Sequence, residues 1–157
     1  ANVCDYLANS KILCCGGSWM VKPEMIAAGD FDGIRKLVRE AVDTMLGLKF
    51  RHVGINSADK TVADGAAKLL SDYFSFPTDE RSASTFASPA IEIMHQNGRG
   101  TKGHIAIGTN SVDRAVYHLG RRGVKFDMST ATYDANGNMK FVYLADEIDG
   151  FAYHLVK

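Results

Sequence analysis

The chain has 157 residues, and its 46% hydrophobic and 23% charged content is typical of a folded globular protein. Basic and acidic residues are equal in number at 18 each, which excludes a strong net field that would attract nucleic acid or an acidic membrane. No apolar run approaches the about 18–20 residues of a membrane span, and we expect no signal peptide, because no basic segment precedes an apolar one.

The three cysteines, Cys4, Cys14 and Cys15, bear on the cellular compartment. An odd number without regular spacing argues against a disulfide framework and indicates a reducing environment. We therefore expect a cytoplasmic protein whose thiols are buried and apolar.

The first 47 residues predict one strand–turn–helix unit. Residues 11–15 are apolar enough for a short buried strand, and residues 16–18 follow as a turn. Residues 30–46 carry apolar side chains at helical spacing, with Asp30 as the candidate N-cap and Gly47 as the terminator. We expect the apolar face of this helix to be buried.

The segment from residue 50 to residue 95 predicts a strand, a helix and two more strands. The predicted elements are a strand at 50–56, a helix at 59–74 with an apolar side of Val62, Ala66, Leu69, Leu70 and Tyr73, an exposed polar edge strand at 78–87 and a strand at 90–95. Because side chains alternate along a strand, His52 faces away from Val53, and Glu92 faces away from Ile93.

The same order of elements recurs after a glycine-rich linker at residues 97–103. The predicted elements are a strand at 103–108, a helix capped by Asn110 or Ser111, a single bent strand or strand pair at 124–133, a hairpin turn at 134–138 and strands at 139–145 and 151–156. Internal repetition is a strong fold signal. The sequence therefore predicts an α+β domain at 49–157, made of two βαβββ modules at 49–97 and 103–157.

Four side chains that can bind metals occupy corresponding places in the two modules. His52 and His104 lie in the first strands, and Glu92 and His154 lie in the last strands. Imidazole and carboxylate ligands suit Zn, Ni, Mn or Fe, and the lack of thiolates argues against a purely structural zinc site. The alternative is that the histidines are ordinary hydrogen-bonded pocket residues.

On these motifs, residues 49–157 resemble the vicinal-oxygen-chelate (VOC), or glyoxalase-like, fold. The Ala90-Ile91-Glu92-Ile93 and Gly103-His104-Ile105-Ala106 stretches carry the resemblance most closely. It implies a partial barrel, as in glyoxalase and bleomycin-resistance proteins, around a metal held by His52, Glu92, His104 and His154, with no organic cofactor. His154 stands where a glyoxalase carries a second glutamate, which leaves Glu92 as the only carboxylate able to serve as a catalytic base.

Residues 2–46 resemble the C-terminal end of the KHG/KDPG aldolase family. The matching stretches are Asp5-Tyr6-Leu7, Gly16-Gly17-Ser18-Trp19, Ala28-Gly29-Asp30-Phe31-Asp32 and Leu37-Val38-Arg39-Glu40-Ala41-Val42. That family is a TIM barrel, so the resemblance makes residues 1–47 its C-terminal strand–helix unit. It also implies that Gly16, Gly17 and Ser18 bind the substrate phosphate in the parent barrel.

This second resemblance implies a lyase that cleaves 2-keto-3-deoxy-6-phosphogluconate or 4-hydroxy-2-oxoglutarate to pyruvate and an aldehyde. The family's Schiff-base lysine has no counterpart here, since none of Lys11, Lys22, Lys36 or Lys49 lies in a matching motif. We therefore expect the chain to be the C-terminal part of a longer aldolase-family polypeptide, without aldolase activity by itself.

Several roles remain open for residues 49–157. They are a metal-dependent lyase or isomerase acting on small oxo-acids, a stand-alone glyoxalase-like metalloprotein, a metal-free ligand-binding module of the bleomycin-resistance type, and an oligomerisation module. The VOC resemblance implies pairing of half-modules between chains, so we expect a homo-oligomer, most simply a dimer. We expect a small oxo-acid as the partner molecule, and neither nucleic acid nor membrane.

Overall fold

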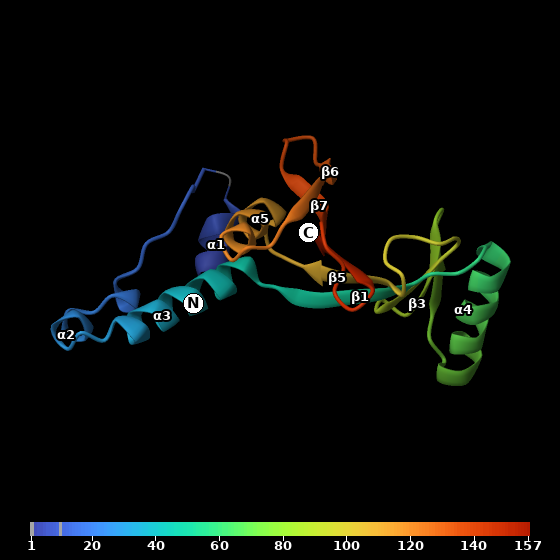
Figure 1. Ribbon diagram of the computed structural model, residues 1–157, viewed down its shortest axis with the longest axis horizontal. Helices are drawn as coiled ribbons and strands as arrows, with labels where there is room; N and C mark the ends of the chain where they lie inside the picture. Colours follow the sequence, from blue (N-terminus) through green and yellow to red (C-terminus); the bar gives the residue numbers. More distant parts are fainter. Residues whose placement is uncertain (1, 10) are drawn as a thin grey trace. The chain divides into compact units, whose positions relative to one another are not determined.

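A computed structural model describes residues 2–9 and 11–157 of the chain. The chain divides into two compact units, residues 1–48 and 49–157, and Figure 1 traces both. No helix in the described residues is long and apolar enough to cross a membrane.

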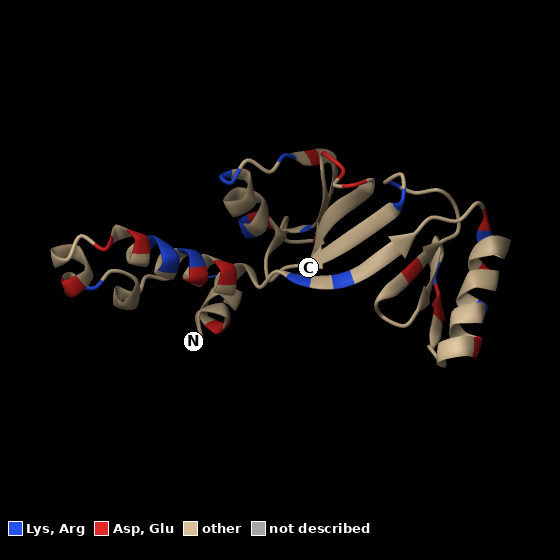
Figure 2. Ribbon diagram, turned by 60° about the horizontal axis from the view of Figure 1, so that its bottom comes forward, with Lys and Arg blue, Asp and Glu red and all other residues tan. Residues whose placement is uncertain are grey.

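The N-terminal unit is helical. Its elements are α1 (Val3–Ala8), the 3-10 turn η1 (Ser18–Met20), α2 (Pro23–Ala27) and α3 (Phe31–Leu46). The α3 helix begins at Asp30, whose Oδ1 accepts a hydrogen bond from the Gly33 N–H at 2.9 Å, and ends at Gly47, which has a left-handed φ of 56°. Acidic and basic residues are interspersed along α3 (Figure 2), and all of them are exposed.

The strand predicted at residues 11–15 does not form, and this prediction was wrong. Residues 12–17 have no regular structure, and Leu13 is 88% exposed. Cys14 and Cys15 are exposed rather than buried. A lone strand leaves its backbone N–H and C=O groups unpaired, and no other strand lies among the described residues of this unit.

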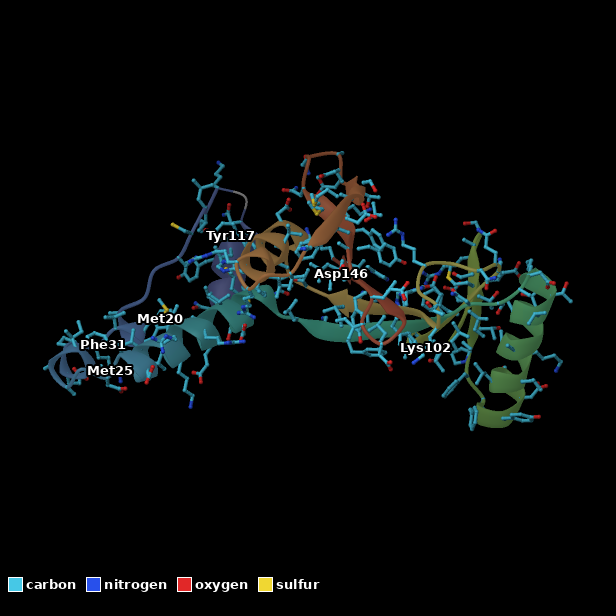
Figure 3. The ribbon with its side chains drawn as sticks, in the orientation of Figure 1. Met20, Met25, Phe31, Lys102, Tyr117 and Asp146 are labelled. Atoms are coloured by element: carbon cyan, nitrogen blue, oxygen red, sulfur yellow. The ribbon has the colours of Figure 1, made fainter. Side chains whose placement is uncertain are left out.

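The N-terminal unit has almost no core. Leu46 is its only buried residue among those described. The apolar face of α3, which we expected to be buried, is only half covered, and Val38 and Phe31 are exposed. Figure 3 shows Phe31 together with Met20 and Met25 at the α2 end of this unit.

The C-terminal unit is a single eight-stranded sheet with two helices, and it has the predicted α+β class. The strands pair in the order β2-β3-β4-β1-β5-β8-β7-β6. Their bounds are β1 (Lys49–Ile55), β2 (Thr78–Glu80), β3 (Ser84–Ala87), β4 (Ile91–Met94), β5 (Gly103–Gly108), β6 (Phe126–Tyr133), β7 (Met139–Leu144) and β8 (Phe151–Val156), with α4 (Lys60–Phe74) and α5 (Val112–Gly120). The sheet is not a closed barrel.

The pairing repeats from one half of the sheet to the other. β1 runs parallel to β4, β5 runs parallel to β8, and the first strands of the two halves, β1 and β5, pair antiparallel at the centre. The first and last strands of each half therefore lie together in the middle of the sheet.

The α4 helix packs through small side chains. Ala63 and Ala67 form a buried cluster with Ala87 and Ile93 of the sheet. Three of the residues predicted for its apolar side are instead exposed, namely Val62, Leu69 and Tyr73. The helix thus faces the sheet mainly with alanines, and these three larger apolar side chains lie away from it.

The predicted edge strand at 78–87 is two strands. A reversal closed by the Arg81 N–H donating to the Ser84 carbonyl at 2.8 Å joins β2 to β3. β2 is the exposed edge, as predicted, but β3 is buried between β2 and β4. Its polar side chains were misread as a sign of exposure. Thr85 is paired with His95, and Ser84 is paired with Glu92.

Candidate metal centre

Four side chains of metal-binding types lie on one face of four adjacent strands. Glu92 comes from β4, His52 from β1, His104 from β5 and His154 from β8, and these strands pair in that order. The strand repeat brings together residues from positions 52 to 154. The structure thus places the four predicted ligand residues in one neighbourhood.

Two small residues make room between these side chains. Gly54 is the register partner of both Glu92 and His104, and Ala106 is the partner of both His52 and His154. Cross-strand partners point to the same face, so large and small side chains alternate across the sheet. A Cβ on Gly54 would lie 2.0 Å from Cε1 of His104, so only glycine leaves space for that imidazole.

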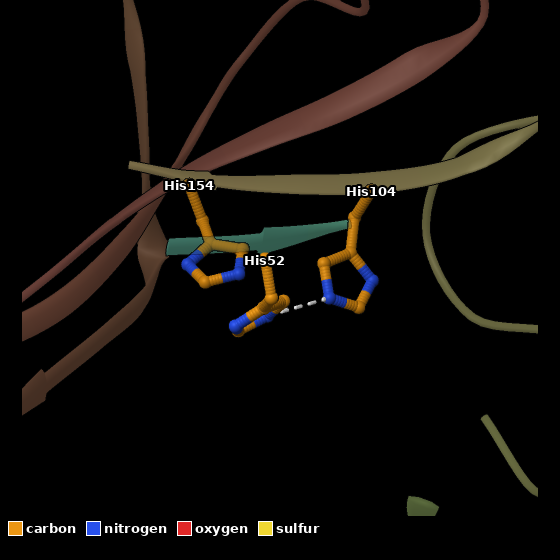
Figure 4. A group of neighbouring side chains, drawn as sticks. All are labelled: His52, His104 and His154. Atoms are coloured by element: carbon orange, nitrogen blue, oxygen red, sulfur yellow. Dashed lines mark hydrogen bonds between the residues drawn. The ribbon is translucent and has the colours of Figure 1, made fainter. Parts of the chain in front are cut away.

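The donor atoms converge on one point. One ring nitrogen of each of His52, His104 and His154 lies within 4.8 Å of the other two. Nε2 of His52 is 3.2 Å from Nε2 of His104 (Figure 4). Oε2 of Glu92 lies 3.0 Å from the His52 nitrogen and 3.1 Å from the His104 nitrogen.

Glu92 is held in its ionised form. Burial acts to raise the pKa of this carboxyl, but hydrogen bonds with His104, His52 and Ser84 outweigh burial and hold the pKa well below its usual range. The Ser84 hydroxyl donates to Oε1 at 2.6 Å, while Oε2 faces the histidines. The hydroxyl thus orients the carboxylate from the side away from the imidazoles.

His154 is held in its neutral form. Burial, together with the nearby His104 and His52, lowers its pKa to about 3. Its Nδ1 is buried and has no hydrogen-bond partner among the residues the structure describes. A neutral imidazole is the form that binds a metal.

Aromatic rings pack against His52 and His154, a feature that the sequence analysis missed. The Phe86 ring lies edge-on to His52 with a 5.3 Å centroid separation, and Phe141 and Tyr143 lie 4.5 and 5.1 Å from the His154 ring. Burial raises the pKa of Tyr143. The signal available in the sequence was the alternation of β7, which puts Phe141 and Tyr143 on one face. The pairing with β8 then places Tyr143 opposite His154.

The donor set fits a divalent transition metal. Metal–ligand bonds of about 2.0–2.2 Å at tetrahedral angles place neighbouring donor atoms about 3.3 Å apart, close to the separations within the His52, Glu92 and His104 group. Two imidazole nitrogens facing each other repel unless a proton or a cation lies between them. Three nitrogens and one carboxylate oxygen suit Zn, Ni, Mn or Fe.

The predicted phosphate-binding residues Gly16, Gly17 and Ser18 lie in the N-terminal unit. A Cβ on Gly17 would lie 1.4 Å from the Trp19 ring, so this ring covers the glycine backbone. Ser18 begins a turn of three residues. No atom lies within 4 Å of a Cβ built on Gly16, so the phosphate-binding role of this loop stays a prediction.

The strand order and the repeat of the two halves define a two-module α+β domain with a glyoxalase-like fold. A solved methylmalonyl-CoA epimerase matches with a TM-score of 0.50 and 17% identity, over 68% of this chain and 92% of that chain. The Mycobacterium tuberculosis methylmalonyl-CoA epimerase matches with a TM-score of 0.50 and 18% identity, over 71% and 88%. At this identity, the likeness shows the fold alone.

The curated relatives match a shorter stretch of the chain. The KHG/KDPG aldolase of Escherichia coli K12 is 56% identical over 43 residues, which are 27% of this chain and 20% of that protein. The 2-dehydro-3-deoxy-phosphogluconate aldolase of Dickeya dadantii is 51% identical over 41 residues, 26% and 19% of the two chains. The chain thus spans about one-fifth of the length of these relatives. No family model matches the sequence.

Proposed function

We propose that residues 49–157 bind one divalent metal through His52, Glu92, His104 and His154 and act on a small oxo-acid. The main support is the close approach of three donor atoms. Nε2 of His52, Nε2 of His104 and Oε2 of Glu92 all lie within 3.2 Å of one another. When bound, the metal would supply Lewis-acid polarisation of two neighbouring oxygens of a 2-oxo or 2-hydroxy acid.

Glu92 is the proposed proton acceptor. It is ionised, it borders the point where the donor atoms meet, and Ser84 fixes its orientation. A carboxylate there can remove a proton from the carbon beside a polarised carbonyl. The surrounding rings of Phe86, Phe141 and Tyr143 reduce water access, which strengthens electrostatic interactions at the site. The resulting activity would be that of a lyase or an isomerase.

For residues 1–47, the proposal is the C-terminal segment of an aldolase-family protein. The 56% identity over 43 residues supports it. The whole polypeptide would then cleave 2-keto-3-deoxy-6-phosphogluconate or 4-hydroxy-2-oxoglutarate, and Gly16, Gly17 and Ser18 would contact a phosphate in its barrel. Cytoplasmic location and homo-oligomeric assembly belong to the same proposal.

A metal-free ligand-binding domain is the second candidate. The observation that favours it is a cavity of about 610 Å³ beside His52, which is large enough for a small molecule whether or not a metal is present. Metal content separates the two candidates.

The test is elemental analysis of the protein after reconstitution and desalting, beside a His52→Ala/His104→Ala variant. The metal-centre proposal expects about one equivalent of transition metal in the wild type and a loss of at least about 100-fold in affinity in the double variant. His95→Ala is the matched control, because His95 contacts Thr85 at 2.9 Å and lies outside the ligand group. If the wild-type protein takes up no metal, the metal-centre proposal is wrong and the metal-free ligand-binding domain is favoured.

A further inference from the structure

A cavity of about 610 Å³ lies beside His52, next to the candidate metal centre. The lining comes mainly from β1, β2 and β3, with His52 and Phe86 as the two residues shared with the surroundings of the centre. Its volume is within the range of about 300–1,000 Å³ of small-molecule sites. A ligand that reached the metal could therefore extend into this cavity.

Three basic side chains line the cavity, Lys49, Arg51 and Arg81, which we call the basic rim. Asp79 is the one carboxylate in the lining, so the cavity carries an excess of two positive charges on a chain of zero net charge. Within residues 2–9 and 11–157, neither Lys49 nor Arg51 has an ion-pair partner. Uncompensated cations in a concave site favour an anionic ligand.

A bulge in β1 turns Arg51 toward the cavity. Phe50 pairs with Ile107 and His52 pairs with Ala106, so Arg51 is the extra residue between two consecutive positions of β5. Bulges of this kind redirect a side chain near functional sites. Strict alternation would have placed Arg51 opposite His52, whereas here both line the cavity.

Gly108 completes this arrangement. A Cβ at Gly108 would lie 2.7 Å from Cδ of Arg51 and 3.4 Å from Cγ of Lys49. The aliphatic stems of both basic residues therefore lie over a position that has no side chain. Figure 2 shows the basic residues at the start of β1.

Arg81 is held at the opposite wall. Its guanidinium carbon lies 4.1 Å from the centroid of the Phe86 ring, and its Nε and Nη2 donate to Oδ2 of Asp79 at 3.0 and 2.9 Å. Arginine has five N–H donors, so these two bonds leave others for a ligand. Stacking on Phe86 orients a planar group that is suited to a carboxylate or a phosphate.

We propose that the basic rim recognises a second anionic group of the substrate. The substrate class is then a small 2-oxo acid that carries a carboxylate or a phosphate at the end remote from its oxo-acid group. The position of the oxo-acid group rests on the proposed metal function, whereas the basic rim is defined by its own geometry. Arg51 and Arg81 make the main contacts.

The first experiment compares three probes of matched length on the metal-loaded 157-residue protein by calorimetry at low ionic strength. They are 2-oxopentanoate, with an uncharged tail, 2-oxoglutarate, with a carboxylate tail, and 2-oxo-4-phosphonobutanoate, with a phosphonate tail. The charged tails are expected to bind at least about tenfold more tightly, since charge-assisted hydrogen bonds supply this difference. The relative affinity of the two charged probes identifies the anion that is preferred.

Two variants test which residues are responsible. Arg51→Met/Arg81→Met keeps the aliphatic stems and is expected to reduce the preference to about twofold or less, with metal content unchanged. Lys68→Met is the matched control, because it removes a cation of α4 that does not line this cavity. Equal binding of the three probes by the wild type, no binding of any probe, or a preference kept in the double variant would each overturn the proposal.

A metal-free arm separates this proposal from the metal function. Inorganic phosphate is titrated into the metal-free protein while the backbone N–H signals of Thr78 and Phe86, which line the cavity, are followed by NMR. Saturable shifts that the double variant lacks support the basic rim even if the protein takes up no metal. The absence of such shifts overturns the basic rim even if the metal binds as proposed.

Discussion

Gly54 determines how closely the ligand-type side chains can approach one another. It lies between Glu92 and His104 in the sheet register, and the His104 ring packs directly against it. Any side chain at this position would occupy the space of the imidazole. The residue has no chemistry of its own, yet the spacing of the donor atoms depends on it.

Gly54→Ala is predicted to weaken metal binding by about 10–100-fold, the usual cost of displacing a group that orients a ligand. The new Cβ would overlap Cε1 of His104, and overpacking would lower the free energy of unfolding by about 1–3 kcal/mol. Metal titration and thermal unfolding measure the two effects. Gly65→Ala on α4 is the control, because no atom lies within 4 Å of its new Cβ. This variant should raise the free energy of unfolding by up to about 1 kcal/mol, since alanine favours the helix more than glycine does. Wild-type metal affinity in Gly54→Ala would contradict the role given to this glycine.

The sequence allowed the ligand-type residues to be grouped, but not their surroundings. Alternation along strands and the repeat of the two modules were enough to put His52, Glu92, His104 and His154 on one face. Arg51 could not be predicted to share that face, because a bulge changes the alternation only once two strands have paired. The contribution of Ser84 was hidden for a similar reason, since its partner Glu92 is on another strand.

At the scale of elements, strands formed where partners exist. The segments predicted at 50–56, 90–95, 103–108 and 151–156 all became central strands of one sheet, whereas residues 11–15 had the same apolar character and remained irregular. The local sequence indicates whether a segment favours an extended backbone. A strand also needs a neighbouring strand that pairs with its backbone N–H and C=O groups. The α1 helix at Val3–Ala8 was missed because six residues without a side-chain cap carry almost no helical signal.

The β6–β7 hairpin was predictable because its turn chemistry is local. Asp134 Oδ1 accepts from the N–H groups of Asn136 at 2.8 Å and Asn138 at 2.9 Å, and Gly137 has a φ of 81°. The hydrogen bonds from Asn138 and Asn136 lower the pKa of Asp134 below its usual value. The carboxylate therefore prefers to be ionised in the folded state.

This preference predicts a pH-dependent effect of Asp134→Asn. Because the folded pKa is below the unfolded value of about 3.9, the carboxylate stabilises the fold above that pH and loses this effect as the pH falls through the folded pKa. The variant should be less stable than the wild type at pH 7, and the difference should shrink below pH of about 4. Urea unfolding at several pH values measures it, with Asp146→Asn as a control for simple loss of charge. A difference that grows on acidification would contradict the argument.

At the scale of the whole chain, the two units differ in how they can be stable. Nearly all buried residues of the described chain lie in 49–157, where α4 and α5 contribute Ala63, Ala67, Val112 and Ala115 to the interior. In the N-terminal unit, the apolar residues of α3 have too few neighbours to cover them. Burial of apolar surface is the main favourable contribution to folding, so stability should reside in the C-terminal unit.

Residues 49–157 expressed alone are therefore predicted to fold and to bind metal as the full chain does. Their melting temperature should lie within about 5 °C of the full-chain value, while residues 1–48 alone should show no cooperative transition. Circular dichroism during heating and metal titration test both statements. A chain of residues 60–157 serves as the control, because it lacks the central strand β1 with His52 and should neither melt cooperatively nor bind metal. Cooperative melting of residues 1–48, or failure of residues 49–157 to fold, would show that stability depends on contacts beyond the core of residues 49–157.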